Sequence, residues 1–359
     1  MIRQKLIVTP RHRCAGLLAA AATAVVLQAC STAPPVGQGA VPTPGTSWAP
    51  GRDLRPAFRR VLCQQLAAET DCSQVLRRLP DERAATGAGP TPLASATELA
   101  RRYRLVFVPG LLSGCAGSLV APFQDVADAL RGQGFDVRIL SVEGRGSTEH
   151  NAELIAEQLS SAAADPRPQI VFGYSKGLPD VMEALVQHPH ATRQVAAVVS
   201  WAGAVGGTPL ADDMSGLEKT LLEHLPLATC PAGDGSELES LRRGVRHSWW
   251  QANHLRLHVP FYSLVALPDP GHISVPLRGT SAQLAHFDVN NDGQLAANDA
   301  IVPGSALLGY VNADHWAIAI ALSRQLPLLR GLFVDDVPRA ALALAAITVI
   351  HQQASHPRP

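Results

Sequence analysis

The segment Gly173-Tyr174-Ser175-Lys176-Gly177 constrains the fold more than any other feature of this chain. It matches the pattern G-x-S-x-G, in which a serine stands on a sharp turn between a strand and a helix. Residues 169–172 before it are mostly apolar and read as a strand, and residues 178–187 after it read as a helix. The serine in such a turn has strained backbone angles, and its neighbours must be small. The two glycines are the small neighbours. The motif therefore predicts that Ser175 is a nucleophile presented at the end of a buried strand.

Strands and helices alternate on both sides of this motif. Apolar runs predict strands at 103–109, 135–142, 169–173, 195–201, 260–267 and 306–311. Helical patterns occupy 119–133, 150–163, 177–188, 316–326 and 340–351. Strands this apolar, separated by helices, indicate a mostly parallel sheet that is covered on both faces. The predicted fold class is therefore α/β, with three α/β/α layers.

This order of elements resembles the α/β-hydrolase superfamily over roughly residues 103–335, and within it the bacterial lipases and esterases. The first core strand ends in Val108-Pro109-Gly110-Leu111-Leu112, where lipases of this family often carry His-Gly. Pro109 replaces that histidine. The resemblance implies that the backbone N–H groups of Leu111 and Lys176 form the oxyanion hole, with Gly110 letting the backbone approach the substrate carbonyl.

A histidine base is expected after the last core strand, because the triad of this fold follows the order serine, acid, histidine. His315 fits this position: it follows the strand at 306–311 and opens the next predicted helix. His272 and His286 come too early in the chain, and His351 and His356 lie near its end. We therefore predict His315 as the general base.

Three aspartates compete for the acid of the triad. Asp299 is the first choice, since residues 298–303 (NDAIVP) resemble the N-D-G-x-V-P segment of bacterial lipases, with Ala300 in place of the glycine. Asp269 lies two residues beyond a predicted strand end, and Asp292 lies in the tripeptide 291–293 (NDG). The sequence leaves the three alternatives open.

Residues 288–299 also match a calcium-binding loop. Oxygen-bearing side chains fall at positions 1, 3, 5 and 12 of such a loop, and glycine falls at position 6, where the chain must turn sharply. This interpretation predicts a structural calcium site, and the alternative is an Asn/Asp/Gly turn without metal. The predicted calcium ligands are Asp288, Asn290, Asp292 and Gln294. No organic cofactor is expected.

The N-terminus reads as a targeting segment. Residues 1–13 carry four basic side chains and no acid, and residues 14–29 are almost all apolar, which is typical of a signal peptide. Residues 27–30 (LQAC) resemble the lipobox of bacterial lipoproteins, which implies cleavage after residue 29 and a lipid on Cys30. Ser31 points to the outer membrane. The Pro- and Gly-rich residues 30–50 then form a tether, so we expect a lipid-anchored protein of the bacterial cell envelope.

The rest of the chain is expected to have two parts, the second of which contains an insertion. Residues 51–98 are expected to form an N-terminal helical appendage with a loop, residues 99–355 the hydrolase domain, and residues 207–258 within it a lid. An oxidising compartment favours two disulfides among the four cysteines that follow Cys30. Of the three possible pairings, we favour Cys63–Cys72 and Cys115–Cys230, because the first pair is local.

Composition narrows the choice of partners. Lys plus Arg and Asp plus Glu both total 30, so no excess of basic charge indicates a nucleic-acid partner. We expect a serine hydrolase that cleaves carboxylic esters, with small-molecule or lipid esters as substrates and the membrane as a partner through its lipid. The alternatives are an amidase, peptidase or acyltransferase on the same scaffold, or a catalytically silent envelope lipoprotein.

Overall fold

A computed structural model describes most of the chain beyond the predicted tether. The described residues are 48–66, 70–82, 93–115, 121–161, 165–214, 230 and 234–355. The predicted signal peptide, the lipidation site Cys30 and most of the tether lie outside these residues. Parts of the predicted lid, 215–229 and 231–233, lie outside them as well.

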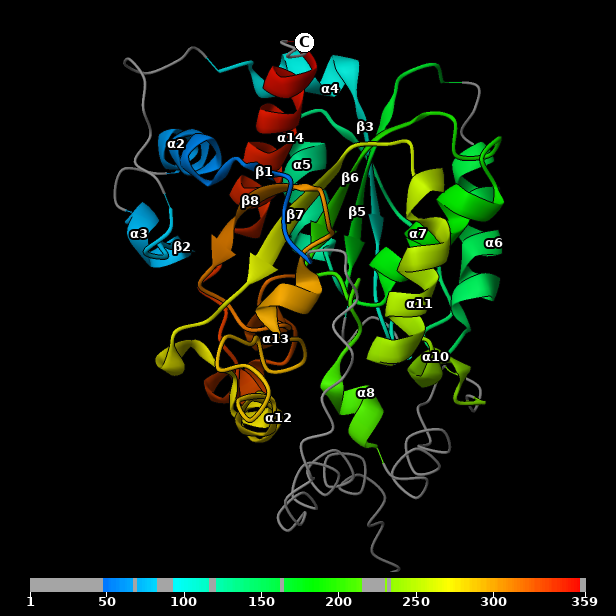
Figure 1. Cartoon of the computed structure of the whole chain (residues 1–359). Helices are drawn as coiled ribbons and strands as arrows, with labels where there is room; N and C mark the ends of the chain where they lie inside the picture. The colour runs from blue at the N-terminus through cyan, green and yellow to red at the C-terminus, as the bar shows by residue number, and fades with distance from the viewer. Residues whose placement is uncertain are drawn as a thin grey trace, which may run out of the picture. The chain divides into compact units, whose positions relative to one another are not determined.

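A mostly parallel sheet forms the centre of the fold (Figure 1). Its six main strands lie in the order β8-β7-β6-β5-β3-β4, and every neighbouring pair among them is parallel. All six strands predicted from the apolar runs are confirmed. They are β3 (Arg104–Val108), β4 (Asp136–Ile139), β5 (Gln169–Tyr174), β6 (Val195–Trp201), β7 (Phe261–Ala266) and β8 (Ala306–Val311).

Helices cover both faces of this sheet, which gives the predicted three layers (Figure 1). The strands are buried on both sides because alternate residues face opposite layers. In β3, Leu105 and Phe107 pack into the core under α5 and α14, while Val106 and Val108 pack into the core under α6 and α7. These four helices are α5 (Gln124–Gly132), α14 (Arg339–Ser355), α6 (Thr148–Ser160) and α7 (Gly177–Gln187).

The segment predicted as an N-terminal appendage is instead part of the sheet and of the core. β1 (Arg52–Asp53) pairs in parallel with the start of β8, and β2 (Leu76–Arg77) pairs antiparallel with its end. Between them, α2 (Arg55–Gln65) packs on α14 and buries Phe58 in the larger core cluster. The outer edge of β8 is therefore covered by residues from the beginning of the chain.

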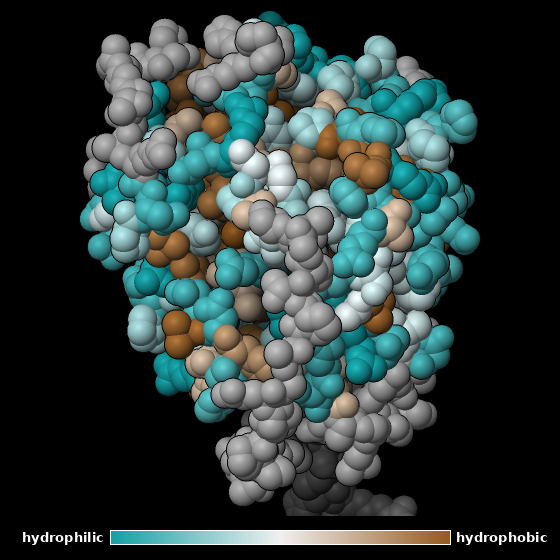
Figure 2. Space-filling view, in the orientation of Figure 1, coloured by the Kyte–Doolittle hydropathy of each residue, from teal (hydrophilic) through white to brown (hydrophobic). Residues whose placement is uncertain are grey.

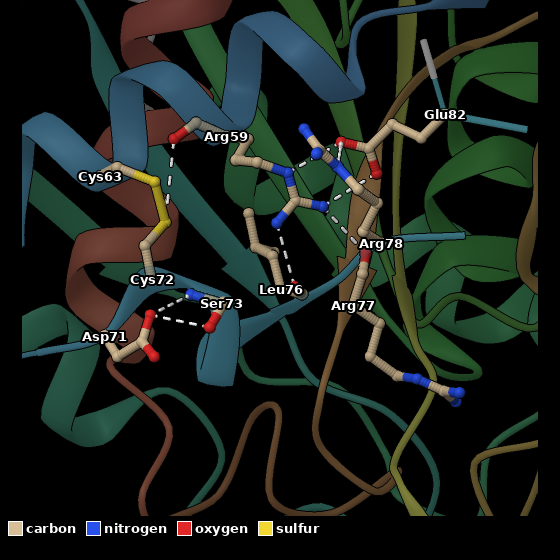
Figure 3. The surroundings of a disulfide bond; sticks show 9 residues. All are labelled: Arg59, Cys63, Asp71, Cys72, Ser73, Leu76, Arg77, Arg78 and Glu82. Atoms are coloured by element: carbon tan, nitrogen blue, oxygen red, sulfur yellow. Dashed lines mark hydrogen bonds and ion pairs between the residues drawn. A yellow bond between two sulfur atoms is a disulfide. The ribbon is translucent and has the colours of Figure 1, made fainter. Parts of the chain in front are cut away.

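A disulfide holds this N-terminal segment together. Cys63, near the end of α2, is bonded to Cys72, the first residue of α3 (Cys72–Val75) (Figure 3). Beside it, the Arg59 guanidinium forms an ion pair with the buried Glu82 carboxylate and donates to the Leu76 carbonyl. The second predicted disulfide, Cys115–Cys230, is also present, so both predicted pairings are confirmed.

The helix predicted over 316–326 forms only in part. Residues 315–319 are turns, and a short helix, α13 (Leu322–Gln325), follows. The physical reason is the buried guanidinium of Arg339, whose Nε and Nη2 donate to the carbonyls of Ala317 and Ile320. These carbonyls would otherwise accept the next intrahelical bonds, so the guanidinium stabilises the interrupted helix.

The described part of the predicted lid contains three α-helices and the short 3-10 helix η2 (His254–Arg256). The α-helices are α8 (Pro209–Asp213), α10 (Ser236–Glu239) and α11 (Arg243–Asn253). Trp250 of α11 belongs to the core cluster under α7, and the Trp249 indole donates to the Glu183 carboxylate of α7. This part of the insertion is therefore fixed to the outer helical layer. The remaining helices are α4 (Ala96–Arg102) and α12 (Arg278–Leu284).

Exposed apolar side chains are scattered over the described surface. On the face shown in Figure 2, hydrophobic residues lie in separate groups among hydrophilic ones. The most exposed large hydrophobic residues are Leu328, Leu255 and Val289. None of the described helices has the length and apolar character that a bilayer span requires.

Candidate active site

Ser175 lies on the turn between β5 and α7, as the G-x-S-x-G motif predicts. Its φ is 51°, in the left-handed region that side-chain-bearing residues rarely adopt. The Ser175 carbonyl accepts from the N–H groups of Leu178 and Ala204, and its own N–H donates to the Ala202 carbonyl. These three bonds hold the strained turn and fix the position of the hydroxyl.

Both glycines of the motif are required by close packing. A Cβ on Gly173 would lie 2.8 Å from Leu178 Cα, and one on Gly177 would lie 2.4 Å from the Pro109 carbonyl oxygen. The turn therefore lies directly against the end of β3. A Cβ on Gly110 would lie 2.7 Å from Ser175 Cβ and 3.3 Å from the Lys176 nitrogen, so the residues after β3 reach the nucleophile.

The two predicted oxyanion donors lie on either side of this contact. Leu111 follows Gly110, and Lys176 follows Ser175 at the start of α7. Within the described chain, neither N–H donates to a backbone carbonyl. The positive end of the α7 dipole favours negative charge at the same place.

His315 is in hydrogen-bonding contact with Ser175. Its Nε2 lies 2.9 Å from Ser175 Oγ, and its side chain is almost fully buried. His315 follows β8, and its carbonyl accepts from the Tyr174 hydroxyl at 2.8 Å. The Asp314 carboxylate accepts from the amides of Trp316 and Ala317, which fixes the turn that carries His315.

Asp292 is the acid that contacts His315. Its Oδ2 lies 2.7 Å from His315 Nδ1, and the Asp292 carbonyl accepts from the His315 N–H at 2.9 Å. The other oxygen, Oδ1, accepts from the N–H groups of Gln294 and Leu295 at 2.9 and 2.7 Å. Every carboxylate oxygen therefore has a partner, although the side chain is 2% exposed.

The prediction that Asp299 orients His315 is wrong. Asp299 lies in a short 3-10 turn at 297–300, where its Oδ2 is 3.1 Å from Arg243 Nε of α11. The two groups are within ion-pair distance, although neither atom meets the geometry of a hydrogen bond to a described residue. Burial raises the pKa of Asp299 to about 6 despite the nearby guanidinium. Asp299 therefore links the insertion to the loop after β7.

Asp269 also has another role. Its carboxylate lies 3.1 Å from Arg77 Nε and accepts from Asn312 Nδ2 at 3.0 Å. These contacts join the end of β7 to β2 and to the end of β8. Of the three candidate acids, the structure thus brings only Asp292 to the histidine.

Two carboxylates of the predicted calcium loop have partners other than a cation. Asp292 directs Oδ2 at His315 and Oδ1 at two backbone amides, and Asp299 faces Arg243. Asp288 Oδ1 accepts from the Asn290 N–H, as in an Asx turn. Among the described residues, no three His, Cys, Asp or Glu side chains are grouped to hold a metal ion. Asp292 and Asp299, at positions 5 and 12 of the predicted loop, thus direct their carboxylates to other partners, and the predicted ligands Asp288, Asn290 and Gln294 stay a prediction.

The sequence did contain a signal for Asp292. The tripeptide Asn291-Asp292-Gly293 reproduces the N-D-G of the lipase pattern without substitution, whereas the segment at Asp299 needs Ala300 in place of glycine. Gly293 has a φ of 92°, and a Cβ there would lie 3.0 Å from Leu277 Cβ. Glycine is thus required at the turn that aims Asp292 at His315.

Comparisons with known proteins identify the fold family. No family model and no curated protein matches the chain. Among solved structures, the metagenomic carboxyl esterase MGS0156 is similar with 32% identity and a TM-score of 0.77, over 93% of this chain and 99% of that chain. The lipase BlEst2 of Bacillus licheniformis, in its propeptide form, matches with 24% identity and a TM-score of 0.50, over 64% of this chain and 49% of that chain. The second likeness shows the fold alone.

Proposed function

We propose a reaction from one premise: this chain belongs to the α/β-hydrolase family that includes the metagenomic carboxyl esterase. The proposed function is the hydrolysis of carboxylic esters through an acyl-enzyme on Ser175. The observation that carries it is the continuous chain of hydrogen-bonding contacts from Ser175 Oγ to His315 and on to Asp292, at 2.9 and 2.7 Å.

In the first half-reaction, His315 Nε2 takes the proton from Ser175 Oγ as this oxygen attacks the ester carbonyl. Asp292 accepts from the Nδ1–H, so it fixes the tautomer in which Nε2 can act as base. The carbonyl oxygen becomes negative and is bound by the N–H groups of Leu111 and Lys176. His315 then gives its proton to the leaving alcohol, which leaves an ester on Ser175.

In the second half-reaction, His315 takes a proton from water as the water oxygen attacks the acyl carbon. The tetrahedral intermediate collapses, the proton returns to Ser175 Oγ, and the carboxylic acid leaves. The proposed reaction uses backbone amides and three side chains, and no step requires a cofactor.

The proposed substrates are lipid or other apolar esters, and the proposed location is the bacterial cell envelope with a lipid anchor on Cys30. The lipobox-like residues 27–30 support the anchor. An enzyme held at a membrane meets apolar esters at high local concentration.

Labelling with a fluorophosphonate, followed by assays on esters of increasing chain length, tests the proposal. We expect the reagent to modify Ser175, and we expect the Ser175→Ala variant to lose both labelling and turnover while keeping its melting curve. Anilide substrates should be cleaved much more slowly than esters. Added alcohols should give little transesterification product compared with the hydrolysis product. Turnover of the Ser175→Ala variant within about tenfold of the parent would overturn the assignment, since loss of a triad member costs far more.

A further inference from the structure

We propose that Asn151 is a positioning residue that links the two halves of the oxyanion hole through a buried polar network. This inference rests on the proposed function, because it concerns the spacing of the Leu111 and Lys176 amides. Asn151 lies in α6 and contacts neither Ser175 nor His315 in the described hydrogen bonds. Its effect would pass through other residues on both sides.

The first arm of the network runs from Asn151 to the nucleophile turn. Asn151 Nδ2 donates to Asp180 Oδ2 at 2.9 Å, and Lys176 Nζ donates to both Asp180 oxygens, at 2.9 and 3.0 Å. Lys176 is the residue whose backbone N–H is the second predicted oxyanion donor. Its side chain is 1% exposed and that of Asp180 is 2% exposed, so the ion pair is fully enclosed.

The second arm runs from Asn151 to the loop after β4. Asn151 Oδ1 accepts from the Glu143 N–H at 2.9 Å, and Nδ2 also donates to the Glu143 carbonyl at 3.1 Å. The next residue, Gly144, accepts from the Leu112 N–H at 2.8 Å. Leu112 directly follows Leu111, the first predicted oxyanion donor.

The loop at 111–113 and the loop at 143–144 pack so tightly that neither can move without the other. A Cβ on Gly144 would lie 2.5 Å from the Ser113 carbonyl oxygen. Leu112 has a φ of 61°, a conformation that costs free energy for a leucine and persists only where the surroundings impose it. The Gly144 carbonyl accepts from the N–H of this strained residue, whose own carbonyl accepts from the Cys115 N–H. Movement of the 143–144 loop would therefore move Leu111.

Stability alone does not account for this network. Burial of an ion pair such as Lys176–Asp180 removes two charges from water, and an apolar pair of similar size is often equally stable. A fixed polar network does, however, specify one geometry. Its two ends are Lys176, which carries one predicted oxyanion amide, and Leu112, which follows the residue that carries the other. An oxyanion hole works only when both donors lie at hydrogen-bonding distance from the same oxygen.

The test uses the full-length enzyme with two substitutions, Asn151→Leu and the milder Asn151→Ser. The first keeps the approximate size and removes every side-chain hydrogen bond. We expect kcat for a good ester substrate to fall by ~10–100-fold, which is less than the ~10²–10³ for complete loss of one donor. We expect KM to change by less than about threefold, because ground-state binding does not depend on the hole.

Inhibitor binding separates positioning from general damage. A trifluoromethyl ketone forms a tetrahedral adduct with an oxyanion, so its Ki should rise by the same factor by which kcat/KM falls. The matching secondary alcohol cannot form the adduct, and its Ki should stay unchanged. The control variant is Thr348→Val, which removes a buried hydroxyl of α14 on the opposite face of the sheet. It should lose thermal stability and keep kcat.

Each outcome decides the inference. Folded Asn151 variants with kcat within twofold of the parent would overturn it, and so would equal weakening of both inhibitors. Should Asn151→Leu not fold, Asn151→Ser gives the decision by the same criteria. If the parent shows no Ser175-dependent ester hydrolysis, the proposed function and this inference fail together. If the parent is active and only the Asn151 prediction fails, the proposed function stands.

Discussion

Replacement of Asp292 by asparagine should nearly abolish turnover, and the geometry explains why. Oδ1 of Asp292 accepts from two backbone N–H groups, so the asparagine oxygen must occupy this place. Its NH2 group then faces His315 Nδ1, where the carboxylate oxygen stood at 2.7 Å. This donor favours the tautomer with Nδ1 bare and Nε2 protonated, and a protonated Nε2 cannot take the proton from Ser175.

The magnitude follows from the cost of the opposite amide orientation. A flipped amide would restore the active tautomer but would turn its NH2 group toward two N–H donors. Two lost hydrogen bonds to buried groups cost ~1–3 kcal/mol each, or ~2–6 kcal/mol together. This range corresponds to a fall in kcat between ~30-fold and ~10⁴-fold, and the corresponding change in a serine protease triad lies at the upper end. We expect kcat to fall by ~10³–10⁴-fold.

The assay compares kcat on a p-nitrophenyl ester for the parent, Asp292→Asn and Asp299→Asn. Asp299→Asn is the matched control, since it is the same chemical change on another buried aspartate of the same loop. The control should retain kcat within about fivefold, because Asp299 faces Arg243 instead of His315. A folded Asp292→Asn enzyme with a kcat within tenfold of the parent, or an equal loss of kcat in both variants, would refute the reasoning.

Three further variants and one measurement on the parent protein have defined outcomes. The carboxyl of Asp299 has its pKa raised from 3.8 to about 6, so the stability it contributes is complete below pH 3.8 and is lost as the pH rises through about 6. The melting temperature of Asp299→Asn should therefore rise relative to the parent between about pH 4 and about pH 7, and a constant difference would contradict this. Simultaneous replacement of Cys63 and Cys72 by serine opens a link across 9 residues and should lower the free energy of unfolding by about 2.5 kcal/mol in urea titrations, with kcat unchanged. Gly110→Ala places a methyl group 2.7 Å from Ser175 Cβ and should lower kcat by at least ~10²-fold in the ester assay; a fully active variant would place the oxyanion loop elsewhere. Mass spectrometry of protein from bacterial membranes should find a lipid-modified Cys30 as the first residue, and an unmodified peptide that continues through residue 30 would exclude the anchor.

The layered fold could be predicted because its strands carry a strong local signal. Runs such as residues 195–201 (VAAVVSW) are apolar on both faces, which is typical of a parallel strand buried between two helical layers. Ser175 could be predicted for the same reason, since the motif and its flanking strand and helix are adjacent in sequence. His315 followed from its place after the last strand.

The acid could not be chosen from sequence, because two overlapping patterns compete over twelve residues. Asp292 and Asp299 both follow an asparagine and both precede a small residue. The unsubstituted N-D-G at Asp292 is a weak signal, and the fold makes the difference clear: the Gly293 turn aims Asp292 at the histidine loop, and α11 brings Arg243 to Asp299. The strands β1 and β2 were missed because two residues carry no periodic pattern, and both depend on a partner far away in sequence.

That distant pairing has a consequence for the order of folding. Arg52 pairs with Ala306, so β1 must find a partner strand about 250 residues away in the sequence, and contacts this distant form more slowly than local ones. Until β1 and β2 pair with β8, the outer edge of β8 has unpaired N–H and C=O groups that can bind a strand of another chain. The pairing of these two short strands therefore ends the period in which this edge can aggregate.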